Sequence, residues 1–329
     1  MKNKIINQIE SSMAACLNNE QLEKLKSVLD SSLIDVNVVE IANIDSSEDN
    51  MKYLQLFIAS KQIEGCSPKT LKYYEMILAT FLKNINIVVK RITTEDLRKY
   101  LNEYQKRNNC SKVSIDNVRR VFSSFFNWLE DENYIIKSSV RRIHKIKTIK
   151  VVKETYSSET MQLLCDNCTN IRDLSIIDFL SSTGIRVGEL VRLNKEDIDF
   201  TNKECVVFGK GSKERRVYFD SSTKIHLQQY LDERSDDCEA LFVSLLKPHN
   251  RLEIAGVEIM LRKLGRRLGI KKVHPHKFRR TMATNAIDKG MPVEQVQKLL
   301  GHTKIDTTMQ YAMVDQNNVK NSYRKFIGK

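Results

Sequence analysis

Apolar residues recur at intervals of three and four along most of the first half of the chain. This spacing lines one face of a helix with apolar side chains. Residues 2–29 therefore predict one or two amphipathic helices, and residues 51–65 predict another. Three further helices have starting signals, which are an N-cap with proline at Ser67 and Pro68, an acidic first turn at residues 93–96, and a cap at Ser111.

The second half of the chain mixes helical patterns with one alternating, β-branched stretch. Residues 204–208 and 215–219 flank a turn with two glycines at 209–213, which predicts a β-hairpin. Caps at Ser157 and Asn170 begin two helices, and further helices are predicted over residues 185–193, 222–234, 255–269 and 315–327. The expected fold class is mainly α, with a small antiparallel β-sheet in the C-terminal domain.

These elements group into four segments. Residues 1–50 are an acidic helical extension, and residues 51–140 are a four-helix domain. Residues 141–154 are a basic linker, expected to be extended because its β-branched residues alternate and it lacks glycine and proline. Residues 155–329 are a second domain with a C-terminal helix. A chain of 329 residues is long enough for two domains with separate cores.

Charge is distributed unevenly along the chain. The net charge is +13, but the first fifty residues contain nine acids and four lysines, so the remainder carries +18. A basic body of this kind predicts a polyanionic partner, with nucleic acid as the first candidate. Solvated helix faces are the alternative for any single basic residue. The expected DNA contacts are on two helices and the linker: Lys69, Lys72, Lys112, Arg119, Arg120, Arg141, Arg142, Lys145 and Lys147.

Cysteine usage and hydropathy indicate the compartment. The seven cysteines are odd in number and scattered, which favours reduced thiols over a disulfide framework. Cys165 and Cys168 form one C-x-x-C pair without a second pair at zinc-finger spacing, so we interpret them as small residues on an apolar helix. No apolar run approaches a membrane span and no signal peptide pattern is present. We expect a soluble cytoplasmic protein.

Candidate chemistry is concentrated in residues 274–311. His276 and Arg279 stand three apart, so on a helix they share a face and can reach one anion. His302 follows a glycine break, and Tyr311 comes nine residues later. A phenol beside basic, hydrogen-bonding groups is a plausible nucleophile for phosphorus. Taken singly, Tyr311 has a core tyrosine as its alternative and His302 a helix-capping residue.

Two more basic residues lie well upstream. Arg186 begins a predicted helix, where the helix dipole prefers an anion, so an arginine there fits a shared phosphate. A surface charge is its alternative. Lys210 lies between two glycines at the predicted hairpin tip. The G-x-x-x-x-G-K-[ST] spacing of a nucleotide-binding loop is absent here.

Four segments together resemble the tyrosine recombinases of the phage integrase family, which includes the Xer recombinases. They read STGIRVGELVRL, GKGSKERRV, HPHKFRRTMAT and LLGHTKIDTTMQY, and they match the family's arginine, lysine, H-x-x-R and G-H…Y boxes in order. The match covers 155–329 well. Over 51–150 the helical pattern is similar to the family's core-binding domain, which implies a two-domain DNA clamp.

The resemblance implies a mechanism and partners. Tyr311 would attack the scissile phosphodiester to give a 3′-phosphotyrosyl enzyme, and Arg186 and Arg279 would hold the non-bridging oxygens. Lys210 would protonate the leaving 5′-oxygen, His276 and His302 would transfer protons or bond the phosphate, and Glu189 would orient the first arginine box. The implied partners are a double-stranded recombination site and a homo-tetramer on DNA, with which an accessory protein is compatible. The resemblance implies no cofactor or metal.

Two departures from the family pattern bear on the role. Arg280 stands where many members carry histidine, and the acidic extension differs from the basic arm-binding domain of larger phage integrases. Both favour a mobile-element recombinase over a housekeeping Xer enzyme that resolves chromosome dimers. A neighbouring subunit is the expected partner of the extension. Two other function classes stay open, which are a type IB topoisomerase and a non-catalytic DNA-binding regulator on the same scaffold.

Overall fold

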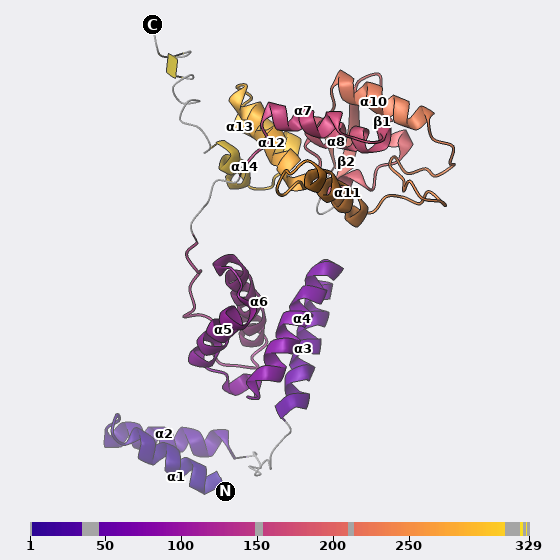
Figure 1. The fold of residues 1–329 in the computed structure, drawn as a ribbon. Coiled ribbons are helices and arrows are strands. Elements are labelled where there is room, and N and C mark those ends of the chain that lie inside the picture. The colour runs from indigo at the N-terminus through magenta and orange to yellow at the C-terminus, as the bar shows by residue number, and fades with distance from the viewer. Residues whose placement is uncertain are drawn as a thin grey trace. The chain divides into compact units, whose positions relative to one another are not determined.

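The computed structural model describes residues 2–34, 46–148, 154–209 and 214–312, with 323, 324 and 327. The chain divides into two compact units, residues 1–149 and 150–329, which have separate hydrophobic cores (Figure 1). The boundary between the units lies inside the predicted basic linker. Among the described helices, none combines the length and the apolar character needed to cross a membrane.

The N-terminal extension forms a helical hairpin of α1 (Lys2–Met13) and α2 (Asn19–Ser32). Asn18 caps α2 by accepting from the Gln21 backbone N–H, while the Gln21 side chain accepts from the Asn18 N–H. The hairpin has little core of its own, since α2 buries no residue and α1 buries Ile6. The prediction of one or two helices is confirmed here.

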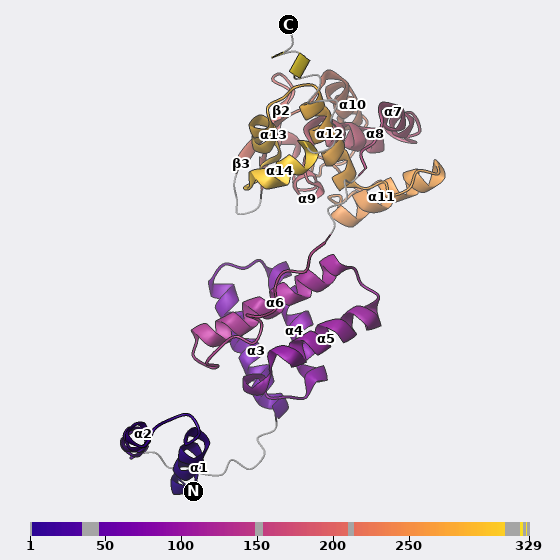
Figure 2. The ribbon, with the colours of Figure 1, turned by 90° about the vertical axis from the view of Figure 1, so that its left-hand side faces the viewer.

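The rest of the first unit is the predicted four-helix domain. Three of the helices begin where the sequence predicts, and Ser67, Thr93 and Ser111 each accept a backbone N–H there. In Figures 1 and 2 the first two helices lie side by side and the last two lie against them. Aromatic side chains form much of the core between these helices. The elements are α3 (Ser46–Ile63), α4 (Pro68–Ile85), η1 (Val89–Arg91), α5 (Thr94–Asn108) and α6 (Lys112–Asp131).

The start of the predicted linker is part of this helical domain and is not an extended connector. Val140 is buried in the aromatic core, and Ile143 and Ile146 pack against it. The backbone N–H of Ile146 donates to the buried carboxylate of Asp116 (3.1 Å). Val140, Ile143 and Ile146 recur every three positions and all face the helical domain. In an extended strand, whose side chains alternate with a period of two, they would not all lie on one face. Residues 149–153 lie outside the described part of the chain.

The second unit is built around α12 (Pro275–Asp288), which contacts helices from both ends of the unit. Figure 2 shows α12 between α8 and the α13–α14 pair. Most predicted helices are present within two or three residues of their expected bounds. They are α7 (Ser158–Asp166), α8 (Ile171–Thr183), α10 (Ser221–Asp232) and α11 (Ile254–Arg267). Two helices for which no range is predicted from the sequence follow α12, and they are α13 (Val293–Leu300) and α14 (Ile305–Ala312).

The predicted hairpin is the core of a three-stranded antiparallel sheet. Strand β2 (Glu204–Phe208) pairs with β3 (Glu214–Tyr218), and the two-residue β1 (Ile198–Asp199) adds an edge strand. Two residues are too few to show the alternation of apolar and polar positions that predicts a strand. Val207 lies opposite Arg215, and Cys205 lies opposite Val217. Because alternate residues share a face, the side chain of Arg215 lies on the buried face of the sheet. The mainly helical fold class is confirmed.

One predicted helix is shorter than expected, and another lies almost entirely outside the described part of the chain. The helix expected over 185–193 is the shorter α9 (Val187–Leu190), because Arg251 donates to the carbonyls of Val191 and Leu193 and the chain turns there. The predicted C-terminal helix over 315–327 falls almost entirely outside the described residues.

Candidate active site

Tyr311 and His302 lie together at the surface of the second unit. Tyr311 is on α14, half-buried against the small cluster of Ala283, Val296 and Leu300. Its ring centroid is 6.1 Å from that of His302, which follows the end of α13. The sequence placed these two residues nine positions apart, and the turn between α13 and α14 brings their rings into proximity.

His302 is held in one protonation state by its two partners. Its Nε2 lies 3.1 Å from Nη2 of Arg279, and its Nδ1 lies 2.9 Å from Oγ1 of the buried Thr308. A guanidinium only donates, so Nε2 accepts and the proton resides on Nδ1. Partial burial, followed by the charges of Arg279, Arg186 and Arg215, lowers the pKa of His302 to about 4. His302 is therefore a neutral imidazole near pH 7.

Three arginines gather at the C-terminal end of α13. Arg279 Nη2 donates to the Leu300 carbonyl (2.5 Å), Arg215 Nε donates to the Leu299 carbonyl (2.9 Å), and Arg186 Nη2 lies 3.4 Å from the Gly301 carbonyl. The last carbonyls of a helix have no partner within it and carry partial negative charge. The end of α13 thus anchors cations that come from three different elements.

Glu189 is the carboxylate within this cluster. It is buried, and it accepts from Arg186 Nη1 (2.8 Å), from the Arg186 backbone N–H (3.0 Å) and from both terminal nitrogens of Arg215. Burial opposes ionisation, but these hydrogen bonds and the charge of Arg215 prevail and lower the pKa of Glu189 to about 2. The predicted contact between Glu189 and the first arginine box is present. Three guanidinium cations and one carboxylate leave surplus positive charge, which suits a phosphate.

Arg279 is the most deeply buried cation of the site. Nη1 donates to the carbonyl of Gly184 (2.7 Å), the left-handed residue that ends α8. The left-handed conformation at Gly184 favours glycine, and a Cβ atom there would require the end of the Met282 side chain to shift. Burial, then the neighbouring charges of Arg186 and Arg215, lowers the pKa of Arg279. The side chain stays cationic at neutral pH because a guanidinium starts from so high a pKa.

Two further predicted catalytic residues are His276 and Lys210. His276 is exposed in the first turn of α12, one turn before Arg279. Lys210 lies outside the described residues. Arg280, the departure from the family pattern, donates from Nε to the Glu154 carbonyl (2.8 Å), so it fixes the entry of the chain into the second unit.

Arg215 and Thr308 belong to the site and were not predicted from the sequence. The signal for Arg215 was available, because it stands two residues before the buried Val217 in a predicted strand and therefore shares its inward face. Its exposed neighbour Arg216 pairs with Glu204 on the other face (2.8 Å). No comparable local pattern indicates Thr308.

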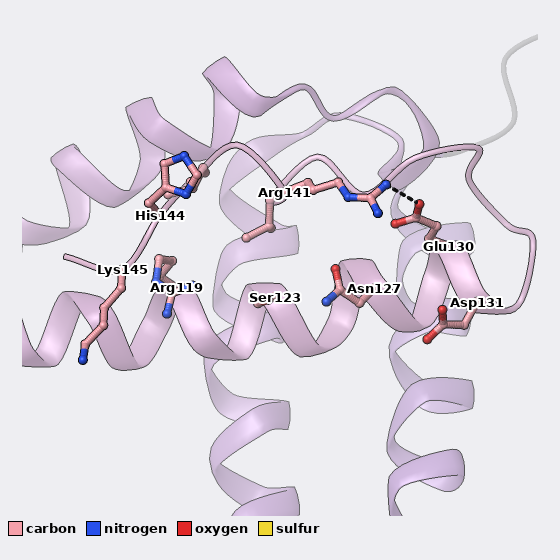
Figure 3. A pocket seen from close by; sticks show the side chains of 10 residues that line it. Arg119, Ser123, Asn127, Glu130, Asp131, Arg141, His144 and Lys145 are labelled. Carbon is pink, nitrogen blue, oxygen red and sulfur yellow. Dashed lines mark hydrogen bonds and ion pairs between the residues drawn. The ribbon is translucent and has the colours of Figure 1, made fainter.

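The predicted DNA contacts of the first unit are exposed, with one exception. The side chain of Arg119 is 13% exposed and bonds to Asp116, so Arg119 holds the linker segment in place. A polar groove of about 590 Å³ lies between α6 and the segment that follows it (Figure 3). Arg141, His144 and Lys145 line one side of it, and Arg141 reaches Glu130 (3.4 Å). The exposed candidates are Lys69, Lys72, Lys112, Arg120, Arg141, Arg142, Lys145 and Lys147.

The C-x-x-C pair packs against the core of the second unit, but only Cys165 lies on the helix that the sequence predicts, because α7 ends at Asp166. Cys165 lies 3.6 Å from an Asp178 oxygen, and Cys168 lies 3.4 Å from the Leu164 carbonyl. Burial raises the pKa of both thiols to about 12, which leaves them protonated. Across the described ranges, no group of three or more His, Cys, Asp and Glu side chains is arranged to hold a metal ion.

Comparison with known proteins assigns both units. The family model described as the phage integrase family matches residues 150–318, and that of the phage integrase N-terminal SAM-like domain matches residues 53–136. Tyrosine recombinase XerC of Oceanobacillus iheyensis is 32% identical over 292 residues, which cover 83% of this chain and 95% of that protein. Tyrosine recombinase XerC of Staphylococcus aureus is 31% identical over 287 residues, which cover 83% and 96%.

Solved structures share the fold at lower identity. The integrase of the transposon Tn1549, solved with a circular intermediate DNA, superposes with a TM-score of 0.68 at 17% identity and covers 83% of this chain and 98% of its own. The XerH recombinase bound to a palindromic difH substrate gives 0.67 at 19% identity and covers 97% and 94%. The family model and the close relatives agree with the four sequence motifs: this chain belongs to the phage integrase family and is a tyrosine-type site-specific recombinase.

Proposed function

We propose that this recombinase cuts and rejoins double-stranded DNA with Tyr311 as its nucleophile. The observation that supports this most is the cluster at the end of α13, where Arg186, Arg279 and a neutral His302 gather and the His302 ring lies 6.1 Å from the Tyr311 ring. A phosphate in this place would meet two guanidinium groups and an imidazole. That set of groups favours attack by a phenol on phosphorus.

The proposed reaction conserves the energy of the phosphodiester bond. Tyr311 Oη forms a bond to phosphorus and the bond from phosphorus to the 5′-oxygen breaks, with Lys210 giving the leaving oxygen its proton. Arg186 and Arg279 bind the non-bridging oxygens as negative charge develops on them. His276 and His302 bond the phosphate or carry protons. A 5′-hydroxyl of another strand then attacks the phosphotyrosine and reforms the same kind of bond, so the step consumes no nucleotide.

The DNA is proposed to contact both units of the protein. The Tn1549 integrase and the XerH recombinase were solved in complex with DNA, and the exposed basic residues of the first unit offer phosphate contacts in this chain. We propose further that the protein acts as a homo-tetramer on two duplexes, with the α1–α2 hairpin contacting a neighbouring subunit. That hairpin has several exposed apolar residues and little core of its own. An accessory protein is compatible with this assembly.

Neutralising four linker residues is expected to weaken DNA binding and to flatten its dependence on salt. Each phosphate contact that is lost lowers the slope of log affinity against log salt by about 0.9. The variant changes Arg141, Arg142, Lys145 and Lys147 to glutamine, and the slope is measured by fluorescence anisotropy between low and moderate salt. A control changes Lys24 and Lys26 on α2 and should leave the slope unchanged. Equal slopes for the linker variant and wild type would remove the linker from the DNA interface.

We propose that the natural substrate is the DNA of a mobile element. The acidic α1–α2 extension and Arg280, which stands where many family members carry histidine, support this role. A chromosomal Xer-type role is the second candidate, favoured by the 31–32% identity to XerC proteins. Sequencing the covalent protein–DNA junctions formed in cells decides between them. Junctions at the ends of an element that flanks the gene support the first role, and junctions at one distant chromosomal site support the second.

A further inference from the structure

We propose that Arg215 is a positioning residue for the recombination reaction. It fixes Glu189, and through Glu189 the side chain of Arg186, against the end of α13 that continues into His302. The inference rests on the proposed function, in which Arg186 and His302 bind the scissile phosphate. Arg215 itself need not touch the DNA.

The Arg215 guanidinium is committed to the protein through all three of its nitrogens. Nη1 and Nη2 form a two-pronged pair with the Glu189 carboxylate at 2.9 and 2.7 Å, and Nε donates to the Leu299 carbonyl at 2.9 Å. The side chain is only 9% exposed. A planar guanidinium matches a carboxylate with both terminal nitrogens and leaves Nε free for a third partner at a fixed angle.

Arg186 depends on this arrangement for its own orientation. Its side chain is 34% exposed, and its hydrogen bonds are to Glu189 at 2.8 Å and to the Gly301 carbonyl at 3.4 Å. Glu189 is therefore the main anchor of Arg186. A buried carboxylate that lost Arg215 would keep Arg186 as its one cationic partner, and it would draw that guanidinium inward, away from a bound phosphate.

Arg215 also packs against the turn that carries His302. A Cβ atom at Gly301 would lie 2.9 Å from Cδ of Arg215, so glycine allows the arginine to pass beneath the turn. Gly301 adopts the left-handed conformation that ends α13, and His302 is the next residue. One side chain from the hairpin thus contacts Glu189, which anchors Arg186, and lies against the turn that carries His302.

The central experiment compares Arg215→Lys with the neighbouring Arg216→Lys. Both variants keep their charge, but the side chain of Arg216 is 65% exposed on the opposite face of the strand. Adduct formation is measured in a single turnover with saturating protein on the mapped recombination site. We expect Arg215→Lys to bind DNA normally and to cleave on the order of 10- to 100-fold more slowly, a smaller loss than removing a direct phosphate donor. Arg216→Lys should cleave like wild type.

A substrate with a methylphosphonate at the scissile position separates positioning from general damage to the fold. Replacing one non-bridging oxygen by methyl removes the negative charge that Arg186 would neutralise. The deficit of Arg215→Lys should therefore shrink on this substrate. Cleavage of the normal phosphate at the wild-type rate, or an equal deficit on both substrates, overturns the proposal.

A second readout needs no DNA and separates this inference from the proposed function. Arg215 is one of the cations that lower the pKa of His302, so Arg215→Met should raise that pKa in an NMR titration. Arg216→Met should leave it unchanged. If wild type forms no adduct while Arg215→Met still shifts His302, the proposed function is wrong and the placement of Arg215 is right. A folded Arg215→Met with an unchanged His302 titration contradicts the placement itself.

Discussion

Replacing Tyr311 by phenylalanine is expected to abolish covalent DNA cleavage while the protein folds and binds DNA as before. Phenylalanine keeps the ring that packs against Ala283, Val296 and Leu300, and it removes only the oxygen that would attack phosphorus. Because the ring is half-exposed, the free energy of unfolding should change by no more than about 0.5 kcal/mol. The adduct is measured on a denaturing gel after incubation with labelled DNA that carries the recombination site.

The matched control is Tyr323→Phe, which changes a more exposed tyrosine twelve residues further along the chain. It should form the adduct at the wild-type rate. A covalent adduct that persists in Tyr311→Phe would move the nucleophile to another side chain. Mass spectrometry of the peptide linked to DNA in wild type gives an independent identification.

Comparing wild type with Tyr311→Phe separates the three function classes that the sequence leaves open. A recombinase forms the adduct at defined sites and exchanges strands between two duplexes. A type IB topoisomerase would relax supercoiled plasmid without sequence preference and without strand exchange. A non-catalytic regulator would bind DNA identically in wild type and Tyr311→Phe, with no adduct from either. The family match supports the first class, and the gel distinguishes it from the third directly.

Sequence alone predicts the elements whose signals are local. The caps at Ser67, Thr93 and Ser111 satisfy backbone N–H groups within three residues, so their effect does not depend on the rest of the fold. The hairpin over 204–219 is predicted for the same reason. The docking of Ile143 and Ile146 onto the helical domain was missed, because it depends on Asp116, which is thirty residues away from Ile146.

In the candidate site too, local sequence signals identify some features, and others depend on residues that are distant in the sequence. The order of the motifs identifies Arg186, Arg279, His302 and Tyr311 as candidates for one site. The structure brings their side chains to one end of α13. Motifs identify residues by spacing and give no information on hydrogen-bond partners across the fold. The neutral state of His302 therefore required the placement of Arg279 and Thr308, and the importance of Arg215 required the Leu299 carbonyl.

Changing Arg279 to lysine is expected to lower the rate of cleavage by about 100- to 1000-fold, the loss typical of a direct donor to developing charge. Arg279 bonds at the same time to the Gly184 carbonyl, the Leu300 carbonyl and His302 Nε2. A lysine ammonium donates from a single point and cannot hold these partners and a phosphate together. Carbonyls left without a donor at this buried site should also reduce the free energy of unfolding by about 1–3 kcal/mol.

The pH dependence of Arg279→Lys distinguishes loss of geometry from loss of charge. Burial and the charges of Arg186 and Arg215 lower the pKa of the cation at this position. Lysine starts from an ordinary pKa of about 10.4, well below that of arginine, so the same environment should neutralise it at a lower pH. Cleavage by the variant should therefore fall further as pH rises from about 7 to 8, whereas wild type keeps most of its cation over that range because the pKa of Arg279 is lowered only to about 9. Arg280→Lys is the control, since Arg280 bonds to the Glu154 carbonyl and should show neither the rate loss nor the alkaline decline. An Arg279→Lys enzyme that cleaves within a few-fold of wild type at every pH would remove Arg279 from the phosphate site.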